Sequence, residues 1–474
     1  MPKKIVLLSA VLAGFLLIPC PAPAAAGQPT IPGAELSWIW AVPFACMLLS
    51  IAIMPLATPG IWRRHCGKIS LFWGLTFLVP CLFIYGPSVA LYELLHTMLL
   101  EYIPFIILLL ALFTVAGGVR LTGTLAGTPA VNTGILLTGA ALASWMGTTG
   151  AAMLFIRPLL RANTHRHYKV HSVVFFIFLV ANIGGSLTPL GDPPLFLGFL
   201  KGVSFFWTTT HLFLMTALLS LALLTLYCIL DAILFAREGR PKPPAATNGE
   251  KLGLDGKINL LLLAGVVSAV LMSGTWQPAA KPVTLYGIEL EWQNIARDLI
   301  LLAIAGLSLK LGSQKCRDKN DFSWGPMQEV AKLFLGIFLT ITPAIAILRA
   351  GTDGALAPLI NLASRDGQPV NIMYFWLTGA LSSFLDNAPT YLVFFNIAGG
   401  DAVQLMGPMS QTLVAISAGA VFMGANTYIG NAPNFMVRSI AEEQGVPMPG
   451  FFGYMLWSGL ILIPAFIVLS WLVF

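Results

Sequence analysis

Long apolar runs separated by short polar segments dominate the pattern along the chain. A helix needs about 20 mainly apolar residues to cross roughly 30 Å of hydrocarbon. The pattern predicts membrane spans near residues 36–56, 69–86, 102–119, 172–200, 208–235, 258–274, 298–312, 333–349, 410–435 and 451–474. The run at 298–312 is short for a crossing.

Two further apolar stretches, 131–156 and 371–396, are interrupted midway by polar and turn-forming residues. Such interruptions are tolerated at membrane depth only where protein surrounds the backbone. We therefore interpret both stretches as re-entrant hairpins. The predicted fold class is an all-α polytopic membrane protein with about 10 transmembrane helices plus two re-entrant hairpins.

Basic residues fall unevenly when these spans are threaded from a periplasmic mature N-terminus. Outside positions are Lys201, Lys281, Arg297, Arg349 and Arg365. Cytoplasmic positions are Arg63, Arg64, Lys68, Arg120, Arg157, Arg161, Arg166, Lys169, Arg237, Arg240, Lys242, Lys251, Lys257, Lys310, Lys315, Arg317, Lys319, Lys332 and Arg438. Cytoplasmic loops carry an excess of Lys and Arg, so this bias supports the orientation.

Composition agrees with a membrane protein. Of the 474 residues, 57% are hydrophobic and 10% charged, whereas a soluble protein carries about 25% charged residues. This excludes a soluble enzyme, a nucleic-acid-binding domain and a disordered regulator, and no nucleic acid is expected as a partner. The net charge of +6 indicates orientation in the lipid bilayer. Six cysteines without Cys-x-x-Cys spacing predict neither a disulfide scaffold nor a zinc site.

The chain divides into four segments. Lys3 and Lys4 precede an apolar run and then Ala24–Ala26, so residues 1–26 are interpreted as a signal peptide, with an uncleaved first helix as the alternative. Residues 36–236 form a first part and 258–474 a second. Between them, residues 237–257 are predicted to be a polar, Pro-rich cytoplasmic linker.

An internal repeat connects the two parts. Residues 185–196 match residues 424–435 with five identities at an offset of 239, and residues 144–149 match 383–388 at the same offset. Each part runs helix, helix, hairpin, broken helix, helix, and the two begin on opposite sides of the membrane. Two inverted repeats with discontinuous helices are typical of secondary transporters. An ATP-driven pump has no support, since no Walker sequence is present.

Asp192 and Asp386 each lie at the polar break of one half. A carboxylate at membrane depth is costly and marks a functional hypothesis. Na⁺ and H⁺ can compete for one such group, because burial favours the protonated form and a bound cation the ionised form. For Asp192 the alternative is a cap on a half-helix near an interface, so Asp386 is the favoured carboxylate.

Oxygen and amide groups near the breaks suit a hard cation. Gly191, Pro193 and Pro194 break one helix, and unwound backbone leaves carbonyl oxygens free. The predicted ion or substrate site comprises Asp386, Asn387, Thr148, Thr149, Asp192, Thr188, Asn182, Asn426, Thr427 and Asn431. Na⁺ is expected at Asp386, Asn387 and Asp192, with no cofactor beyond the transported Na⁺ and H⁺.

At these residues the chain resembles the ion transporter superfamily, and within it the bacterial sodium:proton antiporter or putative citrate transporter group. The sequences that carry the resemblance are 181–194, 381–390 and 424–434, and the resemblance covers about residues 36–474. It implies the bacterial inner membrane and a homodimer whose scaffold domain holds the interface. It also implies a transport domain of hairpins and broken helices that moves as an elevator.

The hairpin tips depart from the Ser-Asn-Thr motif of the superfamily's dicarboxylate carriers. One tip reads Gly147-Thr148-Thr149 and the other Asp386-Asn387-Ala388. The Asp386 tip is more similar to the Asp-Asn-x-Pro-Thr tip of the arsenite-efflux and sodium/proton antiporter branches. The leading prediction is Na⁺/H⁺ antiport. The alternative is a Na⁺- or H⁺-coupled citrate or dicarboxylate transporter. A membrane-embedded enzyme is disfavoured, because the spans lack a His-x-x-x-His or paired Gly-x-Gly-Asp arrangement.

Overall fold

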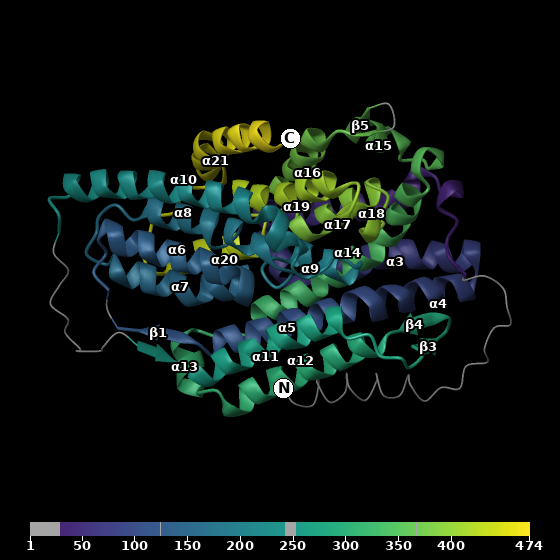
Figure 1. Cartoon of the computed structure of the whole chain (residues 1–474), viewed down its shortest axis with the longest axis horizontal. Helices are drawn as coiled ribbons and strands as arrows, with labels where there is room; N and C mark the ends of the chain where they lie inside the picture. The colour runs from purple at the N-terminus through teal and green to yellow at the C-terminus, as the bar shows by residue number, and fades with distance from the viewer. Residues whose placement is uncertain (1–28, 124, 242–252, 366–367) are drawn as a thin grey trace.

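A computed structural model describes residues 29–123, 125–241, 253–365 and 368–474. The predicted signal peptide at 1–26 lies outside these residues. Most helices run along the long axis of the molecule, and α10 (Trp207–Arg237) and α5 (Ile103–Gly117) lie on opposite sides of the bundle (Figure 1). The prediction of a mainly helical chain is confirmed.

Eight helices within the described residues are long and apolar enough to cross a membrane. The two predicted spans not among them have identifiable reasons. Residues 298–312 belong to α12 (Trp292–Leu311), whose apolar run is diluted by Arg297 and Asp298. Residues 410–435 are divided by a break between α19 (Ser410–Met423) and α20 (Ala432–Glu443). By length and hydropathy alone, the described residues therefore contain eight candidate crossings, fewer than the ten spans that the sequence pattern predicts.

One group of helices packs around α14 (Gly325–Arg349) and α5. Its buried apolar side chains form a core that includes Met47, Phe105, Leu301 and Phe338. Besides α5, α12 and α14, the group contains α2 (Val42–Ala57), α3 (Pro59–Tyr85), α4 (Pro87–His96), η3 (Thr97–Tyr102), α11 (Lys257–Thr275) and α13 (Gln314–Lys319). We call these helices the α14 group.

A second group holds the interrupted segments, and most of an apolar cluster around Phe175, Phe375 and Phe422 lies within it. Besides α10, α19 and α20, it contains α6 (Pro129–Met146), α7 (Thr148–Ala162), α8 (Val170–Leu179), η4 (Ile183–Leu187), α9 (Pro193–Leu200), α16 (Asn371–Phe384), α17 (Asn387–Ile397), α18 (Ala402–Met406), η6 (Gly424–Asn426) and α21 (Phe451–Val473). We call these the broken-helix group.

Both predicted hairpins are pairs of packed helices with a break between them. α6 packs on α7, and α16 packs on α17. The first break is Gly147, whose φ of +81° lies in a region that only glycine adopts without strain. The second break lies at Leu385 and Asp386, just before α17. Each break falls at the polar tip that the sequence marks.

Short strands close the loops at the ends of the bundle. β1 (Arg120–Thr122) pairs antiparallel with β2 (Gly253–Asp255), β3 (Val283–Leu285) with β4 (Ile288–Leu290), and β5 (Ser364–Arg365) with β6 (Gln368–Pro369). Shorter helical turns are η1 (Gly33–Glu35), η2 (Trp38–Ala41), η5 (Gly351–Asp353) and α15 (Ala357–Ala363). The predicted linker at 237–257 begins where α10 ends, and its described end forms β2.

A buried charged network joins α10 to the base of the first hairpin. Asp231 accepts hydrogen bonds from Arg166 Nη2 at 2.7 Å and from Asn132 Nδ2 at 3.0 Å, and His171 Nε2 lies 2.9 Å from the same carboxylate. Arg166 also pairs with Glu238 at 3.0 Å. Buried charges persist when they are paired and hydrogen-bonded, so this network fixes the end of α10 against the hairpin.

Candidate functional site

Four helices of the broken-helix group begin near one point. α7 begins at Thr148, α9 after Asp192, α17 at Asn387 and α20 after Asn431. Two of these starts are extended residues followed by proline within the first helical turn, which suits a helix start because proline has no N–H to leave unpaired. The positive ends of four helix dipoles therefore point toward one place.

The carboxylate of Asp192 lies where these four segments meet. Thr148 Oγ1 and Asn431 Nδ2 each donate to Asp192 Oδ1 at 3.0 Å. Asn387 Nδ2 donates to the other oxygen, Oδ2. The side chain is almost fully enclosed, with 1% of the residue exposed. The carboxylate of one broken helix thus collects donors from both hairpin tips and from the other broken helix.

The four contacting residues form two pairs related by the repeat. Thr148 and Asn387 are 239 positions apart, and so are Asp192 and Asn431. The supporting contacts recur at the same offset. Ser144 Oγ donates to the carbonyl of Gly184 at 2.6 Å, and Ser383 Oγ donates to the carbonyl of Met423 at 3.1 Å.

The Thr188 and Thr427 side chains form hydrogen bonds with backbone groups. The Thr188 hydroxyl donates to the Ser144 carbonyl and accepts from the Leu190 N–H at 3.2 Å. The Thr427 hydroxyl donates to the Ser383 carbonyl at 2.5 Å and accepts from the Ile429 N–H at 3.2 Å. Both hydroxyls therefore tie a helix break to the neighbouring hairpin.

Asn182 supports the central cluster from behind. Its Oδ1 accepts from Asn431 Nδ2 at 3.2 Å, and its Nδ2 donates to Asn434 Oδ1 at 2.7 Å. Asn434 in turn donates to the carbonyls of Gly424 and Thr427, each at 2.8 Å. Asn182 and Asn434 therefore position Asn431.

Two buried amide oxygens near the breaks have no hydrogen-bond partner within the part of the chain that the structure describes. These are Oδ1 of Asn387, whose Nδ2 donates to Asp192, and Oδ1 of Asn426, whose Nδ2 donates to Ser383 Oγ at 2.9 Å. An unpaired buried acceptor costs free energy until a donor or a cation meets it. The Asn387 oxygen thus belongs to a residue that already contacts the carboxylate.

Asp386 lies at the second tip in a different role. Its Oδ1 accepts the Ala388 N–H at 3.1 Å, which caps the start of α17. The residue is half-buried. Thr149, also half-buried, lines the cavity described below. The structure thus brings Thr148, Asn387, Asn431 and Asp192 into direct contact, with the carboxylate of Asp386 capping the adjacent helix.

Two glycines allow the breaks to approach neighbouring backbone closely. A Cβ atom on Gly191 would lie 2.1 Å from the Gly185 carbonyl oxygen, and one on Gly430 would lie 2.5 Å from the Gly424 carbonyl oxygen. No larger residue fits at either position without a backbone shift. The repeat therefore extends to the closest contacts within each break.

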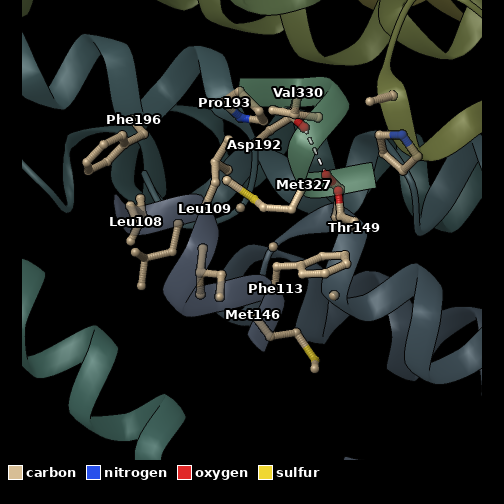
Figure 2. Close-up of a pocket in the computed structure, with 18 of the residues that line it drawn as sticks. Leu108, Leu109, Phe113, Met146, Thr149, Asp192, Pro193, Phe196, Met327 and Val330 are labelled. Carbon is tan, nitrogen blue, oxygen red and sulfur yellow. Dashed lines mark hydrogen bonds between the residues drawn. The ribbon is translucent and has the colours of Figure 1, made fainter. Parts of the chain in front are cut away.

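A cavity of about 110 Å³ lies beside Asp192, large enough for several waters. Figure 2 shows Asp192 and Pro193 on one side of it, with Leu108, Phe113 and Met327 around the space. α5 and α14 supply one wall and α7, α9 and α20 the other. Among the described residues, none that lines this cavity is Lys, Arg or His. The described lining of the cavity between the two helix groups therefore contains the buried carboxylate of Asp192 and no positively charged side chain.

This arrangement suits a small hard cation or a proton. Carboxylate, hydroxyl and amide oxygens are the ligands that such cations take in proteins. A carboxylate ligand would approach the negative charge of Asp192 without a cationic side chain, although helix N-termini and the Thr and Asn donors are present.

Sequence reasoning missed several residues that hold the site. Ser144 and Ser383 lie at matched positions of the repeat, so the offset of 239 could have singled them out. Asn434 has leucine at the matched position, Leu195. Only its place in the fold reveals that Asn434 supports Asn182.

Comparisons with known proteins point to transport. A family model described as putative citrate transport matches residues 33–474. An uncharacterized transporter of Mycobacterium bovis and another of Mycobacterium tuberculosis are each similar to this chain, at 24% identity over 325 residues. The similarity covers 66% of this chain and 70% of each relative.

Proposed function

The chain belongs to the putative citrate transport family, and on that premise we propose that this multi-pass membrane transporter exchanges Na⁺ for H⁺ at Asp192. The observation that carries this proposal is the setting of the Asp192 carboxylate. It is buried, it accepts hydrogen bonds from side chains at three other helix starts, and no Lys, Arg or His lies among the described residues of the adjoining cavity. Intramembrane carboxylates of this kind mark ion pathways.

Na⁺ and H⁺ would compete for the same oxygens. With Na⁺ bound, the Asp192 carboxylate, the Thr148 hydroxyl and the unpaired Asn387 Oδ1 would serve as ligands. Thr149, which lines the cavity at the first hairpin tip, would complete the coordination on the cavity side. With H⁺ bound, the carboxyl group is neutral and no longer compensates the positive charge of a Na⁺ ion. A single carboxylate therefore supplies the competition that antiport requires.

We further propose that the two halves are inverted repeats and that the broken-helix group is the moving part of an elevator. The recurrence of side-chain contacts at an offset of 239 supports the repeat. All four helix starts of the site lie in the broken-helix group, which supports treating that group as one moving unit. The α14 group would then be the scaffold of a homodimer in the bacterial inner membrane.

A second candidate is transport of citrate or a dicarboxylate, coupled to Na⁺ or H⁺. The family description favours it, and so does the convergence of four helix N-termini, which attract anions. Thr148 and Asn387 could donate to a substrate carboxylate if a cation or proton first neutralised Asp192. The two candidates share Asp192 and differ in what crosses the membrane.

Purified protein in liposomes with a trapped pH dye tests the proposal. A Na⁺ pulse outside should move protons in the wild type and fail to do so in Asp192→Asn. The matched control is Asp401→Asn. Asp401, like Asp192, directly precedes a helix, and its side chain accepts the Val403 N–H at 2.8 Å, but it is exposed and outside the cluster. If Na⁺ moves no protons and labelled citrate enters instead, the antiport proposal fails and the second candidate stands.

A further inference from the structure

An ion pair connects the helix that follows Asp192 to the α14 group. Lys201 directly follows α9 and pairs with Glu101 of η3. The two side chains are only 17% and 11% exposed. α9 has eight residues, so Asp192 and Lys201 lie at opposite ends of a rod of about 12 Å. The helix that starts at the candidate site is thus held at its far end by a mostly buried charge.

A second polar contact bridges the same two groups of helices. Arg349, at the end of α14, donates from Nε to Asn396 Oδ1 of α17 at 3.0 Å. α9 and α17 are packed tightly, because a Cβ on Gly198 would lie 2.4 Å from the Tyr391 hydroxyl. A movement of α9 away from η3 would therefore carry α17 with it and break both contacts together.

The residues left behind by such a movement complement each other. η3 packs on α14, and the Thr97 and Thr342 hydroxyls join them at 3.1 Å. The positive charge of Arg349 already acts on Glu101, as does that of Lys201. Glu93 lies in the same neighbourhood and accepts the Ile31 N–H at 3.1 Å. After such a movement Glu101 would have lost Lys201, and Arg349 would have lost Asn396. The two residues would then be opposite charges on adjoining helices.

Glu101 also lies in an irregular segment. η3 is a π-helical turn between α4 and α5. Such turns are rare and are frequent at functional sites, because they change the direction of a side chain within a continuous helix. This feature is independent of the ion pair and marks the same residue.

We propose that Glu101, Lys201 and Arg349 form a partner-exchange latch, in which Glu101 pairs with Lys201 in the present state and with Arg349 once α9 and α17 have moved. The inference rests on the proposed movement of the broken-helix group. Glu101 and Arg349 are positioning residues, since neither touches Asp192. The latch spares Glu101 an unpaired buried charge in either state.

Opposite effects of two substitutions test the latch. Lys201→Gln removes the partner of the present state and should shift the population toward the moved state. Arg349→Gln keeps a donor for Asn396 but removes the partner of the moved state, so it should shift the population the other way. We expect each change to alter the population ratio by about tenfold, because each strands a buried charge. Lys281→Gln is the control, since Lys281 is an exposed charge predicted to lie on the same side of the membrane.

Populations can be read without any cargo. Spin labels at Phe83 of α3 and Val403 of α18 lie on the two groups at exposed positions. In a background without the six native cysteines, double electron–electron resonance gives their distance distribution. Opposite shifts for the two variants, with none for Lys281→Gln, support the latch. Shifts in one direction, or none in protein that elutes as a single folded species, overturn it. Because no Na⁺ or citrate is involved, failure of the antiport assay leaves this result interpretable.

Discussion

Asn431 donates to the carboxylate of Asp192 at 3.0 Å, and the two residues occupy the same position in two copies of one sequence pattern. Contact between matched positions means that the two halves meet at their helix breaks. The two side chains differ by one polar group, because asparagine has an NH₂ group where aspartate has its second carboxylate oxygen. The centre of the cluster is thus alike in shape and unlike in charge.

Asp192→Asn is expected to abolish cation-dependent proton movement. The new amide would place N–H groups or an uncharged oxygen against the donors of Thr148, Asn387 and Asn431, and a buried unpaired donor costs about 1–3 kcal/mol. Asp386→Asn keeps a good helix cap and should cost only a few tenths of a kcal/mol in stability. Transport rates in liposomes and thermal unfolding of both variants check this. A larger loss of transport in Asp386→Asn would reverse the ranking of the two carboxylates.

Asn431→Asp should alter the pH dependence of transport. In the wild type, acid protonates the single carboxylate and displaces Na⁺, so the apparent KM for Na⁺ should rise about tenfold for each pH unit on the acidic side. A second carboxylate 3.0 Å from the first would make both ionised at once unfavourable, so the pair would keep one proton to higher pH. The rise in the apparent KM for Na⁺ on the acidic side should therefore begin at a higher pH in the variant than in the wild type. An unchanged profile would show that Asp192 is not the titrating group.

Gly191→Ala and Gly430→Ala should each disrupt a helix break. Their new methyl groups would lie 2.1 Å and 2.5 Å from backbone carbonyl oxygens, which cannot move aside as a flexible side chain can. We expect a loss of about 1–3 kcal/mol and of transport. Gly134→Ala in α6 is the control, because nothing lies within 4 Å of its added methyl and alanine favours a helix interior by about 0.5–1 kcal/mol. Thermal unfolding in detergent checks all three.

Asp231→Asn should destabilise the protein without touching the central cluster. It removes the carboxylate that pairs with Arg166 and His171 and leaves Arg166 with Glu238 alone. Breaking a buried ion pair costs about 3–5 kcal/mol, and the lower end of that range is expected here. Arg438→Gln breaks the Arg438–Glu442 pair, whose side chains are partly exposed, and should cost under about 1 kcal/mol. A similar, small fall in melting temperature for both would contradict the stabilising role of the Asp231 network.

The sequence predicts the helix breaks well because proline and glycine act locally. The tips at Gly147 and Asp386 and the breaks at Asp192 and Asn431 all lie where the sequence marks them. The ranking of the two carboxylates could not be read in the same way. Both residues directly precede a helix, so their positions along the chain do not tell them apart. Which of them collects the donors depends on how four distant segments meet in the fold.

Contacts between the two helix groups also escape sequence analysis. Glu101 and Lys201 are 100 positions apart, and neither belongs to the repeat match. Glu101 next to an apolar run suggests a solvated helix end, whereas the residue is 8% exposed and paired. Only the placement of α9 against η3 identifies its partner.

The replacement of a carboxylate by an amide at Asn431 has an electrical consequence. With one ionisable group at the centre, the cluster accepts either one Na⁺ or one H⁺, each bearing a single positive charge. An exchange of one for the other moves no net charge across the membrane, so the transmembrane voltage, worth about 2.3 kcal/mol per charge at 100 mV, does no work on the cycle. Only the two concentration gradients would drive it.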